Sequence, residues 1–173
     1  MQLIEFPMIW TIIIDSIAWA IFQLSISYFT LSLSENYFQK QTFIYPARKW
    51  ENEGQFWQTH FSIKKWAKII PDGTRILKKG FYKKNLQQKE ANYLETFILE
   101  TKRAELTHWL SILPSFLFFL WNPVWVGWIM VIYALVFNIP IILLQRYNRP
   151  RLERVLKRKN ARQKNPLMLL KVE

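Results

Sequence analysis

The sequence predicts an all-α membrane protein with about three transmembrane helices, and three observations support this prediction. Of the 173 residues, 51% are apolar and 17% aromatic. Residues 106–145 contain no Lys, Arg, Asp or Glu, and residues 8–33 contain only Asp15. The net charge of +12 therefore lies outside these stretches. Because a helix needs about 20 residues to cross the hydrocarbon core, residues 106–145 allow two crossings and residues 8–33 allow one.

We expect a single membrane domain over residues 1–173. The pair Asn122-Pro123 favours a turn, and it divides the longer apolar stretch into a helical hairpin. Pro140 and Pro114 each remove a backbone donor and should distort their helices. The predicted parts are span 1 at residues 8–33, an interfacial cytoplasmic segment at 34–105, span 2 at 106–121, span 3 at 124–145 and a basic tail at 146–173.

The distribution of Lys and Arg predicts the orientation of these spans. Residues 34–105 carry fourteen of them and residues 146–173 carry ten, whereas residues 1–7 and the turn at 122–123 carry none. By the positive-inside rule, both basic segments face the cytoplasm and the N-terminus lies outside. A cleaved signal peptide is the alternative for the first apolar stretch, but that stretch lacks a basic leader and is long. This placement of charge also explains the positive balance without nucleic acid binding.

The connecting segment carries an amphipathic pattern that is typical of a helix lying on a bilayer surface. A helical arrangement of residues 62–70 separates an apolar side from a lysine side. Aromatic residues nearby would belong to the same interfacial belt. The apolar side is Ile63, Trp66, Ala67, Ile69 and Ile70, the lysines are Lys64, Lys65 and Lys68, and the aromatics are Trp50, Phe56, Trp57 and Phe61.

Several enzyme classes are excluded. The chain has no cysteine and only four glycines, so thiolate chemistry and glycine-rich phosphate loops are absent. Neither histidine is followed five residues later by the Asp of the phospholipid acyltransferase motif, because His60 leads to Lys65 and His108 leads to Leu113. There is no G-x-S-x-G elbow. Two histidines without clustered carboxylates predict no catalytic metal, and we expect no cofactor.

Glu105 and His108 form the strongest candidate for proton transfer. The residues from Lys89 to Glu105 have helical periodicity, and their apolar stripe leads into span 2 at these two positions. A carboxylate that orients an imidazole can support general-base catalysis. An interfacial pair that satisfies only itself is the alternative. His60 is the alternative base, and Ser111 could form an acyl-enzyme, although a serine in a membrane helix usually bonds a helix carbonyl.

The end of span 3 brings amides and arginines close to one another in sequence. Asn138 is an expensive group to bury in a membrane without a partner or ligand. Arg146, Arg149 and Arg151 lie within six residues and could clamp a phosphate or carboxylate. Anchoring to anionic lipid is the competing interpretation. Asp15 lies in the middle of span 1, where a carboxylate is costly unless it faces the helix bundle. It is therefore a weaker site candidate.

Two long motifs resemble a known family. They are E-T-K-R-A-E-L-T-H-W-L-S-I-L-P at residues 100–114 and N-I-P-I-I-L-L-Q-R-Y-N-R-P-R-L at 138–152. Both are similar to the glycosyl-4,4'-diaponeurosporenoate acyltransferases, and E-G-Q-F-W at 53–57 and the K-K-W and P-D-G of residues 64–73 also fit. Within these motifs we place the substrate-binding candidates Arg103, Trp109, Asn138, Gln145, Arg146, Tyr147, Asn148, Arg149 and Arg151.

The resemblance implies a bacterial membrane enzyme that esterifies a fatty acyl group onto the sugar 6-hydroxyl of a glycosylated carotenoid acid in staphyloxanthin biosynthesis. The implied partners are membrane lipid, this carotenoid, an acyl donor such as acyl-CoA and, as an open point, other enzymes of the pathway. His108 would take the hydroxyl proton while Arg146 or Arg149 holds the donor. A non-catalytic scaffold or lipid-presenting module of such a pathway is the rival hypothesis.

Overall fold

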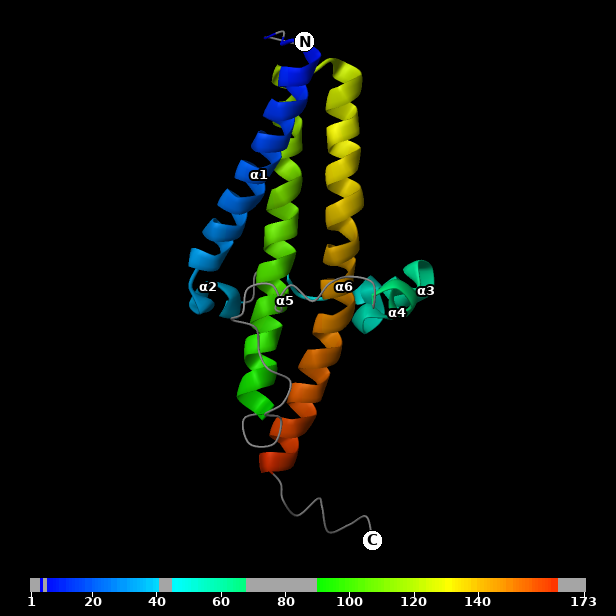
Figure 1. Cartoon of the computed structure of the whole chain (residues 1–173). Helices are drawn as coiled ribbons and strands as arrows, with labels where there is room; N and C mark the ends of the chain where they lie inside the picture. The colour runs from blue at the N-terminus through cyan, green and yellow to red at the C-terminus, as the bar shows by residue number, and fades with distance from the viewer. Residues whose placement is uncertain (1–3, 5, 41–44, 68–89, 165–173) are drawn as a thin grey trace. The chain divides into compact units, whose positions relative to one another are not determined.

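The computed structural model describes residues 4, 6–40, 45–67 and 90–164, and all regular elements in these ranges are helices. This confirms the all-α class. The chain divides into two compact units, Met1–Lys40 with Arg103–Ile142 and Gln41–Lys102 with Leu143–Glu173. Helices α5 (Glu90–Ile112) and α6 (Val124–Lys164) each contribute one part to either unit (Figure 1).

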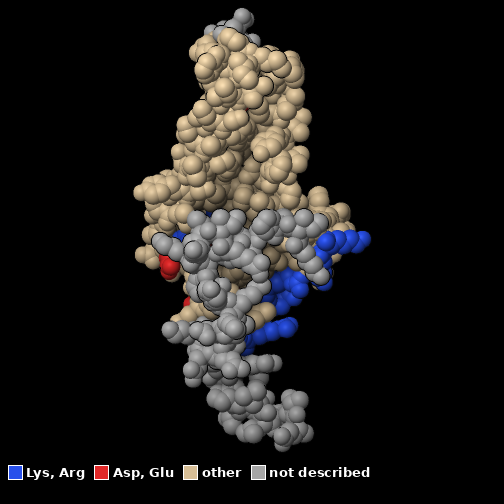
Figure 2. Space-filling model, viewed as in Figure 1, with Lys and Arg blue, Asp and Glu red and all other residues tan. Residues whose placement is uncertain are grey.

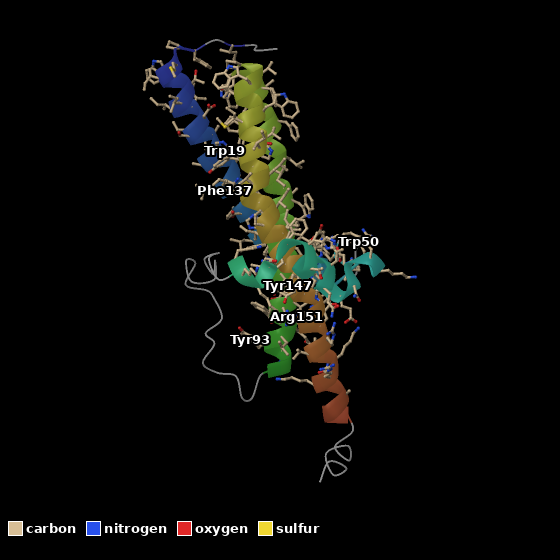
Figure 3. The ribbon with its side chains drawn as sticks, turned by 90° about the vertical axis from the view of Figure 1, so that its right-hand side faces the viewer. Trp19, Trp50, Tyr93, Phe137, Tyr147 and Arg151 are labelled. Carbon is tan, nitrogen blue, oxygen red and sulfur yellow. The ribbon has the colours of Figure 1, made fainter. Side chains whose placement is uncertain are left out.

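The first unit is built on α1 (Met8–Ser32), the short α2 (Glu35–Gln39), the end of α5, the 3-10 helix η3 (Leu113–Leu120) and the first half of α6. Aromatic rings join α1 to its neighbours: Trp19 stacks on Phe118 at 4.9 Å between centroids and meets the edge of Tyr133 at 5.4 Å (Figure 3). Most other apolar side chains of α1 are exposed.

Two helices are long and apolar enough to cross a membrane, Met8–Ser32 and the Val124–Ala161 part of α6. Their exposed apolar side chains fit a membrane protein, since lipid takes the place of a covering layer. Figure 2 shows the corresponding contrast, with Lys and Arg gathered over the second unit and uncharged residues over the visible face of the apolar helices.

Span 2 differs from the expected single helix. The α-helix ends at Ile112 and continues as the 3-10 helix η3, in whose first turn Pro114 lies. Pro114 lacks the N–H that an α-helix would direct to Leu110, which is the distortion that the sequence predicts. The turn at residues 121–123 follows, and Gly127 then leaves room on α6 for the ring of Phe119.

Helix α6 also differs from the expected boundary. It does not end near residue 145 but continues without interruption to Lys164, so part of the expected tail is helical. Residues 146–164 contain no glycine, and their Arg, Lys and Leu residues favour helix, while the one proline, Pro150, does not end it. Residues 146–164 of the basic tail are thus an extension of the apolar helix.

Asp15 of α1 faces the hairpin turn of the first unit. Its Oδ1 accepts hydrogen bonds from Trp121 Nε1 at 2.7 Å and from Asn122 Nδ2 at 2.9 Å, and the residue is buried. A carboxylate in an apolar environment needs such donors. Asp15 therefore ties the first helix to the turn of the hairpin, as its position in the apolar stretch requires.

The second unit contains η1 (Lys49–Gly54), α3 (Gln55–Phe61), α4 (Ile63–Trp66), the first part of α5 and the second half of α6. The predicted amphipathic helix over residues 62–70 is observed only as the short α4, and residues 68–70 lie outside the described residues. Ser62 has φ +48° and separates α3 from α4. Ile63 is fully buried against Leu143 and Tyr147, so this position packs on α6 instead of facing a bilayer.

Candidate active site

His108 lies on α5 and is held by Asn138 of α6, within the first unit. Its Nδ1 is 2.7 Å from Asn138 Oδ1, while Asn138 Nδ2 donates to the carbonyl of Ala134 at 2.8 Å. A carbonyl only accepts, so the second bond fixes the orientation of the amide. Oδ1 is then an acceptor, and Nδ1 of His108 must carry the proton.

This arrangement defines what the imidazole can do. With the proton on Nδ1, the neutral ring has its lone pair on Nε2, which is the form that a general base requires. Asn138 is buried and His108 is half-buried. Asn138, which the sequence placed among the substrate-binding candidates, is thus the residue that orients His108.

Glu105 lies on the predicted stripe, but the hydrogen-bond partner of His108 is another residue. It is fully buried on α5, one turn before His108, which agrees with the predicted stripe. Of the residues that the structure describes, however, Asn138 and not Glu105 holds the His108 ring. Sequence spacing favoured Glu105 because residues three apart on one helix are neighbours, whereas Asn138 lies thirty residues further along the chain.

His60 is far more exposed than His108. It lies in the last turn of α3 in the second unit, where its Nδ1 donates to the Phe56 carbonyl at 2.9 Å and its ring lies 4.1 Å from the Phe56 ring. Its Nε2 also has an available lone pair in the neutral form. Among the described residues no side chain forms a hydrogen bond with His60, whose partner is a carbonyl of its own helix.

Arg149 is buried in the second unit, with an exposed fraction of 2%. Its Nε donates to Thr101 Oγ1 at 3.0 Å, its Nη2 to the Thr101 carbonyl at 3.1 Å and its Nη1 to the Tyr45 carbonyl at 2.8 Å. All three nitrogens therefore have partners within the protein. A phosphate clamp at Arg149 would have to reach a buried guanidinium whose three nitrogens already donate within the protein.

Arg146 is likewise used within the second unit. Its Nη1 contacts Oε1 of Glu51 at 2.5 Å, and Oε2 of Glu51 accepts a hydrogen bond from the Arg48 backbone N–H at 3.0 Å. Glu51 has an exposed fraction of 1%. Sequence reasoning missed this carboxylate, whose only signal was its position near the start of a short helix.

Gly54 explains how η1 approaches α6 so closely. It has φ +89°, and a Cβ at this position would lie 2.9 Å from the carbonyl oxygen of Tyr147. Only glycine fits both the backbone conformation and the space. This is the physical reason for the glycine in the E-G-Q-F-W motif.

The remaining predicted binding residues differ in their exposure and their contacts. Arg151 is exposed on α6, and its guanidinium lies 4.7 Å from the centroid of the Tyr147 ring (Figure 3). Trp109 is exposed on α5, and Arg103 lies 5.2 Å from the centroid of the Phe38 ring in the first unit. Tyr147 is buried, whereas Gln145 and Asn148 are half-buried.

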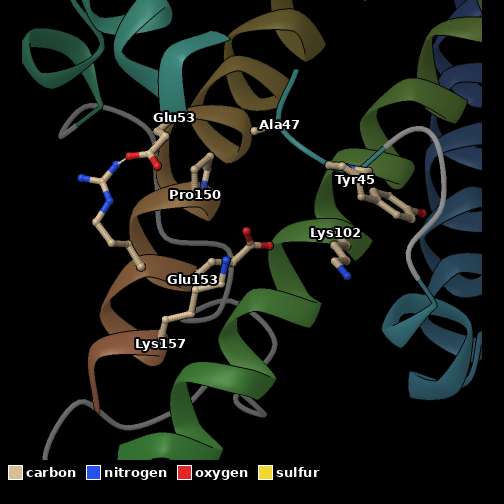
Figure 4. A pocket seen from close by; sticks show the side chains of 9 residues that line it. Tyr45, Ala47, Glu53, Lys102, Pro150, Glu153 and Lys157 are labelled. Carbon is tan, nitrogen blue, oxygen red and sulfur yellow. Dashed lines mark ion pairs between the residues drawn. The ribbon is translucent and has the colours of Figure 1, made fainter. Parts of the chain in front are cut away.

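A pocket of about 340 Å³ lies in the second unit (Figure 4). Its charged lining residues are Lys102, Arg154, Lys157, Glu53 and Glu153, and Arg154 forms an ion pair with Glu53. Burial lowers the pKa of Lys102, although the nearby Glu153 raises it in part. Sequence reasoning missed this pocket, because its walls come from three separate segments.

No group of three or more His, Cys, Asp or Glu residues that could hold a metal ion occurs in the part of the chain that the structure describes. In the first unit the candidate site is the imidazole of His108, which Asn138 orients. The arrangement is suited to acid–base chemistry on a hydroxyl group or an acyl carbonyl.

The class of protein follows from a comparison with known families. A family model described as glycosyl-4,4'-diaponeurosporenoate acyltransferase matches residues 35–158. Those residues contain both long motifs, His108 and Asn138. The chain belongs to this family and is an acyltransferase.

Individual relatives support this assignment. The glycosyl-4,4'-diaponeurosporenoate acyltransferases of Staphylococcus aureus strains Newman, bovine RF122 / ET3-1 and USA300 are each 39% identical over 150 residues, which cover 85% of this chain and 90% of the relative. The resemblance noted in the sequence is thus confirmed. No solved structure shows a significant match to the chain.

Proposed function

We propose that the protein transfers a fatty acyl group to the sugar 6-hydroxyl of a glycosylated carotenoid acid, the last step of staphyloxanthin-type biosynthesis. The names of the 39% identical relatives support the acceptor class. The two apolar helices support a location in the membrane, where a polyene and a fatty chain both dissolve.

The observation that carries the chemistry is the hydrogen bond between His108 and Asn138. In this proposal Nε2 of His108 takes the proton of the attacking hydroxyl, and Asn138 keeps the ring in the required tautomer. The imidazolium that forms still donates from Nδ1 to Asn138, so proton uptake does not break the pair. His60 remains the alternative base.

The sequence favoured Arg146 or Arg149 as the residue that holds the acyl donor, and the contacts of these arginines change that proposal. Arg146 and Arg149 each bond groups of the protein, whereas Arg151 is exposed beside Tyr147. We therefore assign recognition of an anionic donor group to Arg151 rather than to its two neighbours. A guanidinium on an aromatic face keeps its N–H groups available at the edge for a phosphate.

Three spans with the N-terminus outside remain part of the proposal. The second span would combine the end of α5 with η3, which together supply residues 106–120 as helix. The absence of native cysteine allows single cysteines to be introduced at Gln87 and at Lys164. Both should be protected from an impermeant thiol reagent in intact cells; labelling at residue 87 alone would refute this topology.

The decisive experiment supplies the purified full chain with the glycosylated carotenoid and, in separate reactions, an acyl-CoA, an acyl carrier protein thioester and a phospholipid. We expect a carotenoid ester from at least one donor, identified by its mass. A His108→Gln protein that inserts normally serves as the control for contaminating activity. No ester from any donor would favour the scaffold alternative.

A further inference from the structure

The buried hydroxyl groups of the helices point to a residue with an unused bonding capacity. Thr30 donates to the carbonyls of Ile26 and Ser27, Thr101 to Ile98 and Ser115 to Ile112. Each of these bonds goes to a backbone carbonyl three or four residues earlier in the chain, which is the ordinary solution for a hydroxyl in an apolar helix. These threonine and serine hydroxyls are therefore satisfied locally.

Ser111 differs from these buried serine and threonine residues. It lies on α5 with an exposed fraction of 1%, and its Oγ has no hydrogen-bond partner. A buried polar atom without a partner is rare in proteins and destabilises the folded state. The usual explanation for a serine in a membrane helix therefore does not apply to Ser111.

The position of Ser111 relates this hydroxyl to the oriented histidine. Ser111 follows His108 by three residues within the α-helical part of α5, so both side chains lie on one face of the helix. Asn138 holds Nδ1 of His108 and leaves Nε2 as the acceptor. The order of an amide, an imidazole and a nucleophile is the arrangement by which proteins activate a hydroxyl or thiol.

We propose that Ser111 is the nucleophile of this acyltransferase and carries the acyl group between donor and acceptor. This inference rests on the proposed function, because it takes the same base and the same acyl group. It replaces direct transfer by two half-reactions. The hydrogen bond from the Ser111 hydroxyl to Nε2 of His108 need not be present before the substrate binds. Catalytic hydrogen bonds often shorten only in the complex.

In the first half-reaction, Ser111 Oγ attacks the carbonyl carbon of a thioester or oxoester donor while Nε2 of His108 takes the hydroxyl proton. The new O–C bond remains, the bond from the carbonyl carbon to the donor's sulfur or oxygen breaks, and His108 returns the proton to the departing thiol or alcohol. The product is the Ser111 ester.

In the second half-reaction, the sugar hydroxyl attacks the same carbonyl carbon and gives its proton to His108. The bond between this carbon and Ser111 Oγ breaks, and Oγ recovers the proton. One acyl group has moved and no oxidant or reductant is needed. Asn138 acts in both halves only by holding the ring.

The test begins with the unaltered full chain in lipid nanodiscs and without acceptor. It is incubated with an acyl-CoA bearing an isotopic label in the acyl chain, or with whichever donor class gives ester in the full reaction. Intact-mass measurement should show one added acyl group, removable by hydroxylamine, and peptide mapping should place it at residue 111. The protein should also exchange labelled free CoA into acyl-CoA without acceptor.

Two serine variants provide a matched pair. Ser111→Ala removes the proposed nucleophile, whereas Ser115→Ala removes an equally buried hydroxyl that only bonds the Ile112 carbonyl. We expect Ser111→Ala to lose acylation and to lower ester formation by roughly 1,000-fold or more, as losses of catalytic serines do. Ser115→Ala should keep both activities within a few-fold.

The outcomes separate the two proposals. Ester formation with neither acylation at residue 111 nor donor exchange would overturn the nucleophile and leave the proposed reaction standing. Acylation of Ser111 that no glycosylated carotenoid removes would support the nucleophile and refute the acceptor. If Ser111→Ala does not fold, the acyl mapping and exchange on the unaltered chain decide the question alone.

Discussion

The two compact units of this protein differ in how the side chains of their candidate sites are bonded. In the first unit a few polar groups lie among apolar helices, and those that keep bonding capacity include Nε2 of His108 and Oγ of Ser111. In the second unit Arg146 and Arg149 donate to Glu51, Thr101 and Tyr45. A high local charge therefore does not identify the reactive groups; remaining bonding capacity is the better guide.

This comparison has a physical basis. Burying a charged group is costly unless its hydrogen bonds are satisfied. A buried arginine therefore bonds groups of the protein, and these bonds occupy the donors that it would offer to a substrate. A neutral imidazole or hydroxyl can be buried with fewer bonds at a smaller cost. The first unit can thus keep reactive groups ready, whereas the second unit uses its charges to join η1, α5 and α6.

The largest expected effect falls on His108. General-base assistance contributes about 100- to 10,000-fold, so His108→Gln should lower turnover by about that range. His60→Gln is the matched variant, and we expect it to lose much less because that ring is exposed and bonds only its own helix. Ester formation is measured on variants that insert and extract like the parent. A large loss in His60→Gln together with near-normal ester formation in His108→Gln would assign the base to His60.

A smaller but more diagnostic effect is expected at Asn138. Asn138→Ala should lower turnover by about 10- to 100-fold, the usual effect of a residue that orients a reactive one. Asn138→Asp, which retains an acceptor for Nδ1–H, should recover much of the loss and move the pH profile of kcat/KM to higher pH, since a carboxylate stabilises the imidazolium. An unmoved profile in both variants would mean that Asn138 is only a packing residue.

Arg149 and Arg151 sharpen the comparison within the second unit. Arg149→Ala leaves two carbonyls and a threonine hydroxyl without their donor and should lower the stability by about 2–4 kcal/mol. Arg151→Ala should change stability by less than about 1 kcal/mol but raise the KM for a phosphate-bearing donor. Thermal unfolding in detergent and donor titrations measure the two effects. Equal stability losses would contradict the assignment of separate roles.

The smallest effect concerns Lys102, which lines the pocket of the second unit. Burial lowers its pKa below the ordinary 10.5, so the folded state binds fewer protons than the unfolded chain between the lowered pKa and 10.5. Stability should therefore rise slightly with pH across this window, and Lys102→Met should remove the rise. Titration of the ¹³C-methylated protein by NMR should show a Lys102 signal that titrates below 10.5; a signal at or above that value would exclude the burial effect.

The sequence by itself determined the helical class and the apolar stretches, and it selected His108 as the first candidate for the base, a role that stays a prediction. Apolar runs and charge-free lengths are local properties, so they can be counted along the chain. The continuous stripe from Ile98 through Thr101 to Glu105 was also readable, because helical neighbours recur at fixed spacing, and all three residues are buried.

Only the tertiary structure decided the partners of these residues. Asn138 was recognised as an unusual amide, but its bond to His108 joins two helices, and no spacing rule predicts which residues of two helices meet. The same holds for Glu51 with Arg146 and for the bonds of Arg149. The chain specifies which polar groups enter an apolar environment, whereas packing decides which of them are satisfied there and which remain available to react.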